Sequence, residues 1–362
     1  MIPLRRWTAI LLCLLMLPAA ALGETWYTFT VDNPPEALLL PASPVDGDVV
    51  ITFLGDCALG GVRKMQGAER GFVKTVERMG YAYPLQNLLP LTAEDDITVA
   101  NLEGVLSDRK LKRVPKEYNF QGKTEYTEIL RLGSVELVTL ANNHTHDYGD
   151  DGYNDTKQAL KAAEIPYFTE KSVTVWERDG LRIGFVGVQY SASGDKGKRM
   201  KQQIALLKEL GCAAVITVMH AGEEHTQDLS DYQHQIVSRA IAGGADMIVG
   251  HHPHVVQGFD MIDGVPVAYS LGNCSFGGTL IPADADALVL QTKLHIEGGR
   301  LVSGELAFHP ISITGDEKYN DYSPVLAAGE DAARVLQKME ASTGYAMPPF
   351  EEGRGSVVHV DW

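Results

Sequence analysis

Three of the four residues from His251 to His254 are histidines, and an apolar run at residues 247–249 precedes them. Such a run followed at once by glycine, here Gly250, is typical of a buried strand that ends in a tight loop. Side chains two positions apart on extended backbone point to the same side, so we expect His252 and His254 to converge on one point. Neutral imidazole is the commonest metal ligand, and histidines that merely cap strand or helix ends would explain one of these residues more readily than three. We therefore predict that the cluster forms half of a metal site.

Five other places in the chain repeat this pattern of a short apolar run and then a polar loop with glycine. The polar side chains in these loops are Asp56, Asn101, Glu103, Asn143, His144, Asp147, His220, Glu224 and Asn273. Open α/β sheets place their sites just beyond the C-terminal ends of the strands, which is where each loop falls. Six such loops at one edge would build one site, whereas a structural role for all six would be a coincidence.

The apolar runs and the segments between them predict an α/β fold with a largely parallel or mixed sheet covered by helices. The predicted strands are residues 49–54, 97–100, 135–141, 182–188, 213–219, 247–249, 265–271 and 288–296. The predicted helices are residues 62–79, 124–132, 152–163, 198–210 and 229–242, and Asp228 or Ser230 is positioned to cap the last one.

The loop side chains form a mixed oxygen and nitrogen ligand set, made of Asp56, Glu103, Asn143, His220, His252 and His254. Such a set suits Mn, Fe or Zn better than Ca or Mg, which prefer oxygen alone. The sequence has no thiolate cluster at zinc-finger spacing. We expect one or two divalent transition metals, which would activate water for hydrolysis and, as a pair, would clamp a displaced phosphoryl group.

His144 follows Asn143 directly and should lie close to the metal without necessarily binding it. Asp147, three residues further on, is placed to orient the ring of His144. A histidine held by a carboxylate beside a metal is a candidate general acid for a leaving group. The alternative is that Asn143 and Asp147 close a turn with Gly149.

Single residues in the set have simpler explanations. Asp56 follows Gly55 in a pair that is also common in turns, and Glu103 would serve as a helix cap. Glu224 is either a ligand or a supporting partner of a histidine, and we favour the supporting role. Asn273 is explained equally well as a turn residue.

A basic run, formed by Lys110, Lys112, Arg113 and Lys116, follows Glu103. We favour a solvated loop for it over a clamp for carboxylates or phosphates. No glycine-rich phosphate loop, Gly-x-Ser-x-Gly elbow or Cys/His dyad stands out, so the sequence does not support nucleotide-dependent or covalent catalysis.

Length and charge limit the possible functions. The 362 residues suffice for one large α/β domain or two smaller ones. The chain has 47 acidic and 31 basic residues and a net charge of −16, which argues against nucleic acid or an anionic membrane surface as the main partner. Of the four cysteines, Cys13 lies in the N-terminal apolar run that is predicted to be removed. The remaining three, Cys57, Cys212 and Cys274, are predicted to be buried free thiols, because an odd number argues against a disulfide framework.

The N-terminus has the order of a secretory signal peptide, with arginines, an apolar run at residues 9–17 and then small residues. We predict a signal peptide at residues 1–23, and so an exported protein. Residues 24–46 carry four prolines and are expected to form a linker. The main domain is predicted at residues 47–315, and residues 316–362 form a C-terminal extension to which we assign no function.

The sequence resembles the CapA family of capsule-synthesis proteins, named for poly-γ-glutamate capsule formation, from about residue 49 to about residue 313. The motifs that carry the resemblance are Gly55-Asp56…Gly60, Asn101-Leu102-Glu103-Gly104, Ala141-Asn142-Asn143-His144…Asp147-Tyr148-Gly149, His220-x-Gly222-x-Glu224, Gly250-His251-His252-Pro253-His254-Val255-Val256-Gln257, Tyr269-Ser270-Leu271-Gly272-Asn273, Asp155-Thr156 and Gln233. The combination is highly specific, although no single motif would be.

That family is similar to the calcineurin-like metallophosphoesterases. The resemblance therefore implies a metallophosphatase-like two-sheet sandwich flanked by helices (α/β/β/α) with a two-metal site. It implies that the metal ligands are Asp56, Glu103 (or Asn101), Asn143, His220, His252 and His254, that His144 is the acid, and that Asn101, Glu224, His251 and Asn273 support the ligands or bind substrate. It also implies a secreted or cell-envelope protein that acts in the synthesis, export or remodelling of poly-γ-glutamate or a similar anionic polymer. The substrate would be that polymer or a phosphoester.

The sequence departs from these patterns in ways that leave a rival function open. Ala58 stands where the broader superfamily has a histidine, which favours a catalytically idle subunit that binds the polymer or a membrane-bound polymer synthase. Ala221, His225 and Cys274 stand where the family usually has an aromatic residue, tyrosine and phenylalanine, so the pocket is expected to differ in width or polarity.

Overall fold

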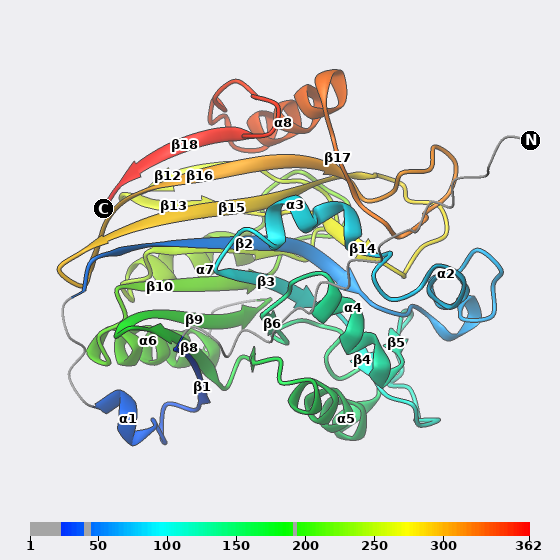
Figure 1. Ribbon diagram of the computed structural model, residues 1–362, viewed down its shortest axis with the longest axis horizontal. Coiled ribbons are helices and arrows are strands. Elements are labelled where there is room, and N and C mark those ends of the chain that lie inside the picture. The colour runs from blue at the N-terminus through cyan, green and yellow to red at the C-terminus, as the bar shows by residue number, and fades with distance from the viewer. Residues whose placement is uncertain (1–22, 40–44, 191–193) are drawn as a thin grey trace, which may run out of the picture.

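The computed structural model describes residues 23–39, 45–190 and 194–362, so the predicted signal peptide lies outside the described residues except for Gly23. Within the described ranges the strands form two large sheets that stack on each other (Figure 1). The first sheet has the order β1 (Glu24–Phe29), β8 (Val173–Arg178), β9 (Leu181–Gln189), β10 (Ala214–His220), β11 (Met247–His251), β13 (Val265–Ala268) and β12 (Phe259–Ile262).

The second sheet has the order β17 (Val325–Leu326), β16 (Arg300–Ser312), β15 (Asp286–Glu297), β2 (Gly47–Ala58), β3 (Ile97–Leu102), β6 (Leu137–Thr139) and β7 (Tyr167–Phe168). Two further strands join it, because β14 (Asn273–Phe276) pairs with β2 and β18 (Ser356–Asp361) pairs with β16. Two short strands, β4 (Val105–Leu106) and β5 (Gln121–Gly122), pair separately.

The main core lies between the two sheets. Val49, Ile51 and Phe53 alternate along β2 and face strands of the first sheet, where Ile183 and Phe185 belong to the same buried cluster. Alternation puts the intervening side chains on the outer faces. Both faces of the central strands are therefore buried, as the continuous apolar runs predict.

Helices cover both outer faces. The helices α6 (Gly194–Glu209) and α7 (Asp231–Ile241) pack on the first sheet, and α2 (Phe72–Met79), α3 (Leu89–Thr92), α4 (Thr127–Leu132) and α5 (Gly149–Ala162) pack on the second. The molecule is therefore a two-sheet sandwich flanked by helices, which confirms the predicted fold class. Ser230, rather than Asp228, caps α7 in a capping box with Gln233.

Both ends of the described chain differ from the sequence-based expectation. Residues 24–29 were predicted as part of a linker, but β1 is an antiparallel edge strand beside β8, and a short helix α1 (Glu36–Leu39) follows it. Beyond residue 315 the chain continues the same fold, because β17 and β18 pair with β16 and α8 (Gly329–Thr343) packs on that strand.

The helix predicted from residue 62 begins only at Phe72, after a 3-10 turn at Arg63–Met65.

Strand direction brings the predicted loops together. The strands β2, β3 and β6 are parallel in one sheet, and β9, β10, β11 and β13 are parallel in the other. The C-terminal ends of both sets carry the polar loops. Among the described residues, no helix has the length and apolar character needed to cross a membrane.

Candidate metal centre

A bulge in β2 turns Asp56 toward the space between the sheets. Phe53 pairs with Val99 of β3 and Asp56 pairs with Asn101, so between these two pairs two residues of β2 oppose one residue of β3. The extra residue places Asp56 on the same side as Asn101, whose Nδ2 donates to Asp56 Oδ1 at 2.6 Å. Bulges often redirect a side chain beside a functional site, and this one anchors the first predicted ligand.

Glu103 is the least satisfied polar side chain in the centre. It is 0% exposed, and neither carboxylate oxygen accepts a hydrogen bond from any described residue. Its Oε1 lies 3.7 Å from Nε2 of both His144 and His220 and 3.9 Å from His254 Nε2. Burial and the nearby charge of Asp56 raise the pKa of Glu103 well above its usual range. Because a buried carboxylate without partners is costly, this environment fits a cation at Glu103.

The first sheet supplies the histidines. His220 ends β10 and His251 ends β11, so both point between the sheets, whereas His252 and His254 lie in the following turn. Both turn residues have left-handed backbone, with φ of 100° and 57°, which is a strained conformation for a residue other than glycine. The expectation that His252 and His254 lie on extended backbone is therefore wrong. Their rings still converge, with centroids 6.0 Å apart.

Asp56 fixes that turn. Its Oδ2 accepts the backbone N–H of His252 at 3.1 Å and lies 3.3 Å from His254 Nδ1. His251 Nδ1 lies 3.3 Å from Asp56 Oδ1, and His254 Nδ1 lies 2.9 Å from the side-chain oxygen of Asn273. His251 and Asn273 thus contact Asp56 and His254, two of the predicted ligands.

The pKa values of the centre follow from burial and from these neighbours. Burial opposes ionisation of Asp56, but the His251 and His254 rings outweigh it and hold the pKa of Asp56 well below its usual range. Burial also opposes protonation of His254, but Glu103 and Asp56 raise the pKa of His254 to about 10. Burial lowers the pKa of His252 to about 4 and that of His220 well below its usual range. His252 and His220 are therefore neutral near pH 7, the state in which an imidazole binds a metal, whereas His254 would release a proton on binding one.

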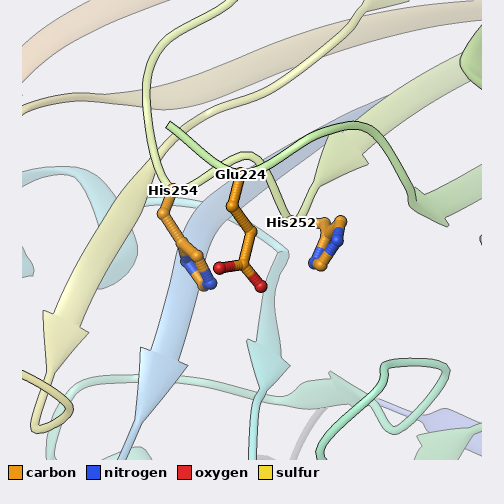
Figure 2. A group of neighbouring side chains, drawn as sticks. All are labelled: Glu224, His252 and His254. Carbon is orange, nitrogen blue, oxygen red and sulfur yellow. The ribbon is translucent and has the colours of Figure 1, made fainter. Parts of the chain in front are cut away.

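Two overlapping groups of side chains have the spacing to hold a metal ion. Asp56, Glu103 and His254 form the first group, and Glu224, His252 and His254 form the second. In each group, one ligand atom per residue lies within 4.8 Å of the others. Figure 2 shows the Glu224 carboxylate projecting between the two imidazoles. Glu224, for which we favoured a supporting role, therefore lies at ligand distance, and His254 belongs to both groups.

The predicted general acid, His144, contacts Asp147, the carboxylate predicted to orient it, and we call these two residues the acid pair. His144 Nδ1 lies 2.7 Å from Asp147 Oδ2, and burial lowers the pKa of His144. Asp147 is 0% exposed, and its Oδ2 also accepts the backbone N–H of Phe120 at 2.5 Å. The ring of Phe120 packs on His144 with centroids 4.2 Å apart. The imidazole is therefore held at Nδ1 and on one face, while Nε2 is directed toward Glu103.

Asn143 also reaches the centre, because its side-chain oxygen lies 2.9 Å from His220 Nε2. Three further residues take part that the sequence did not single out for the site. Asn142 donates to Asn101 Oδ1 and to the Leu102 carbonyl at 2.9 Å, joining two loops. Lys116 forms an ion pair with Asp147 and donates to the Asn143 carbonyl at 2.9 Å. Tyr190 stacks edge-on against His252.

The two adjacent asparagines, Asn142 and Asn143, were the sequence signal that could have indicated a role for Asn142 in the site. Lys116 and Tyr190 lie in loops, and the sequence does not reveal how these loops fold. A hollow of about 240 Å³ opens beside the centre. Its lining combines polar ligand candidates with apolar residues and includes His144, Glu224, His225, His254, Asn273, Tyr118, Phe120, Phe276 and Ile281.

Residues 50–277 match the family model described as "Bacterial capsule synthesis protein PGA_cap". The chain is 28% identical over 297 residues to the "Capsule biosynthesis protein CapA" of Bacillus anthracis, a match that covers 75% of this chain and 68% of that protein. It is 29% identical over 248 residues to the "PGA biosynthesis protein CapA" of Bacillus subtilis (strain 168), which covers 62% of each. The chain thus matches about two thirds of the length of these relatives. A solved chain aligns with a TM-score of 0.38 and 11% identity over 69% of this chain, a likeness too distant for functional comparison.

Proposed function

The chain belongs to the bacterial capsule synthesis protein family PGA_cap, and from this membership we propose that it is a metal-dependent hydrolase that acts in the formation of poly-γ-glutamate or a similar anionic envelope polymer. The bond cleaved is a phosphoester or an amide of that polymer or its precursor. The proposed place of action is outside the cytoplasm, in line with the capsule names of the relatives and the signal-peptide pattern at residues 1–23.

One observation carries this proposal. Glu103 is fully buried with two unpartnered oxygens, and imidazoles from three loops surround it. In the described part of the chain, no lysine or arginine forms an ion pair with Glu103. A divalent cation would satisfy the Glu103 carboxylate and the neutral rings of His144 and His220, so the residues present fit a metal.

The proposed ligands are Asp56, Glu103, Asn143, His220, His252, His254 and Glu224. Their mixture of oxygen and nitrogen favours Mn, Fe or Zn. A bound cation would supply Lewis-acid activation of water and of the scissile group. Asn101, Asn142, His251 and Asn273 hold the ligand side chains in place through the contacts described above.

His144 is the proposed general acid. Its Nδ1 donates to Asp147, so a second proton on the ring occupies Nε2, the atom directed into the centre. Burial lowers the pKa of His144, which makes the protonated ring a stronger acid toward a leaving group. Asp147 keeps the ring oriented and stabilises its charge, as carboxylates do for catalytic histidines.

A second function is favoured by Ala58. This residue lies in an apolar cluster with Val62, Phe120 and Phe276, so no imidazole enters the centre from that position. A subunit that binds the polymer or a synthase without catalysing a reaction would need fewer metal-binding side chains than an enzyme.

The deciding experiment measures metal content and turnover on the same samples of wild type, Glu103→Gln and His254→Ala. The substrates are a p-nitrophenyl phosphodiester and poly-γ-glutamate, the latter followed by new amino groups. A matched control is His309→Ala, because His309 is a buried histidine of β16 outside the centre. We expect bound Mn, Fe or Zn and turnover in wild type and control, and neither in the two site variants. Metal without turnover on either substrate favours the binding subunit, and no metal under any loading condition contradicts the site.

A further inference from the structure

A basic segment lies beside the candidate metal centre. Residues 107–123, which include the connection from β4 to β5, contain six lysines and arginines and two acidic residues in a chain whose net charge is −16. The sequence alone favoured a solvated loop here. The contacts of this segment indicate instead an ordered surface that could bind a ligand.

Four exposed cations of this region have no carboxylate partner in the described chain. They are Arg63, Lys110, Lys112 and Arg113, and we call them the cationic strip. Their neighbour Arg109, by contrast, is paired with Asp155. Arg63 makes one hydrogen bond, to the carbonyl of Leu111 at 3.2 Å. Unpaired cations in an acidic protein are available to an anionic ligand.

The strip lines two neighbouring hollows, which share Arg63. One hollow of about 490 Å³ includes Lys110, and another of about 530 Å³ includes Lys112 and Arg113. The second hollow also reaches Lys116. Lys116 contacts Asp147 and His144 of the proposed acid pair, so the strip ends at the centre.

Buried and paired groups hold the segment in shape. Gln121 Nε2 donates to the carbonyls of Ser107 and Arg109 at 2.9 and 3.0 Å. The guanidinium of Arg109 makes two bonds of 2.8 Å to Asp155. The backbone N–H of Val114 donates to the Asp147 carbonyl at 2.9 Å, which ties the strip to the acid pair. A surface ordered in advance loses less entropy on binding than a mobile loop.

We propose that the cationic strip binds an extended polycarboxylate chain and guides it toward His144. This inference rests on the proposed function and names how its polymer substrate is held. Ammonium and guanidinium groups pair with carboxylates, and the acidic remainder of the surface repels a polyanion from other approaches. The run of hollows accommodates several residues of an extended chain rather than a single small anion.

The test is binding of fluorescently labelled poly-γ-glutamate to the metal-loaded full chain, followed by anisotropy at increasing NaCl concentration. Lys112→Ala/Arg113→Ala removes two charges from the strip. Lys198→Ala/Lys201→Ala removes two exposed charges from α6 and serves as the matched control. We expect the strip variant to bind about tenfold more weakly and with a shallower salt dependence, and the control to bind as wild type does.

Equal affinity of the two variants, or no binding of polymer by the wild type, overturns the inference. Polyphosphate that binds as tightly as poly-γ-glutamate, and with the same loss in the strip variant, overturns the assignment to carboxylates. Because binding is measured apart from turnover, the two proposals fail separately. A wild type that binds polymer through the strip but hydrolyses neither substrate keeps this inference and loses the proposed reaction.

Discussion

Carboxylates lie at both ends of the central strands, and Glu103 at one end has surroundings opposite to those of three carboxylates at the other. At the N-terminal ends, Asp96 precedes β3, Glu136 precedes β6 and Asp246 precedes β11. Each accepts a backbone N–H of the neighbouring strand, from Val50, Thr98 and Val215, at 2.8, 2.8 and 2.6 Å. At the C-terminal ends, Glu103 accepts no hydrogen bond from the described residues.

By this difference we distinguish a structural acid from the proposed metal ligand Glu103. The N-terminal carboxylates satisfy backbone groups and, at two of the three positions, pair with a cation: Asp96 with Arg178 and Asp246 with Lys208. Residue type and burial are therefore not enough to identify a site. An acidic residue whose partners are missing from the protein is the better signal, because the fold supplies partners where it needs them only for stability.

The strongest test of this comparison is the substitution Glu103→Gln, which keeps the shape of the side chain and removes its charge. We expect metal affinity and turnover to fall at least about 100-fold. The metal-free variant should be as stable as the wild type or more so, because burial disfavours the ionised form of Glu103 and raises its pKa. Metal titration and chemical denaturation of the metal-free proteins measure the two effects. Marked destabilisation of the metal-free variant would mean that Glu103 is a structural acid after all.

The opposite outcome is expected for Asp246→Ala. This change leaves the Val215 N–H without its acceptor and Lys208 without its partner, so the free energy of unfolding should fall by about 2 kcal/mol. Metal content should not change, because Asp246 lies at the other end of β11 from His251. Denaturation midpoints and elemental analysis test this, and a loss of metal in a still-folded variant would show that the two ends are coupled.

Glu136 is predicted to make the stability of the protein depend on pH. Burial raises the pKa of Glu136 to about 8, well above the value of about 4.5 in the unfolded chain. The folded state therefore binds more protons between these values, and stability decreases as pH rises from about 4.5 to about 8, by at most about 1.4 kcal/mol per pH unit. Glu136→Gln should flatten this part of the profile. Equal slopes for variant and wild type would contradict the raised pKa.

Much of this arrangement could be predicted from the sequence. Short apolar runs identify buried parallel strands, and the shared direction of their C-terminal ends explains why Asp56, Glu103, His220 and the histidine cluster meet. The edge strand β1 could not be recognised in the same way, because it is only half-buried and prolines follow it. Its position depends on pairing with β8, which is distant in sequence.

The details of the site needed the structure. The bulge that turns Asp56 inward shows only when β2 is aligned with β3. The left-handed backbone of His252 and His254 accompanies the contacts of Asp56 with that turn, and the local sequence does not indicate it. Lys116 enters the centre because the segment before it folds back onto Asp147, a long-range contact that a basic run does not reveal.

The smallest predicted effect belongs to Asp96→Asn, and it sharpens the comparison because the same substitution can be made at Asp56 on the neighbouring strand. Asparagine keeps an oxygen for the Val50 N–H, and Arg178 retains its contacts with Glu24 and the face of Trp176. We expect a loss of about 1 kcal/mol or less, with full metal content, because the pair is partly solvated. Asp56→Asn should instead weaken metal binding strongly, since an amide does not supply the negative charge that the imidazole cluster and the cation require. Thermal denaturation and metal titration of the two variants side by side provide the measurement. Similar metal losses in both would mean that the two ends of these strands do not differ in their capacity to hold a metal.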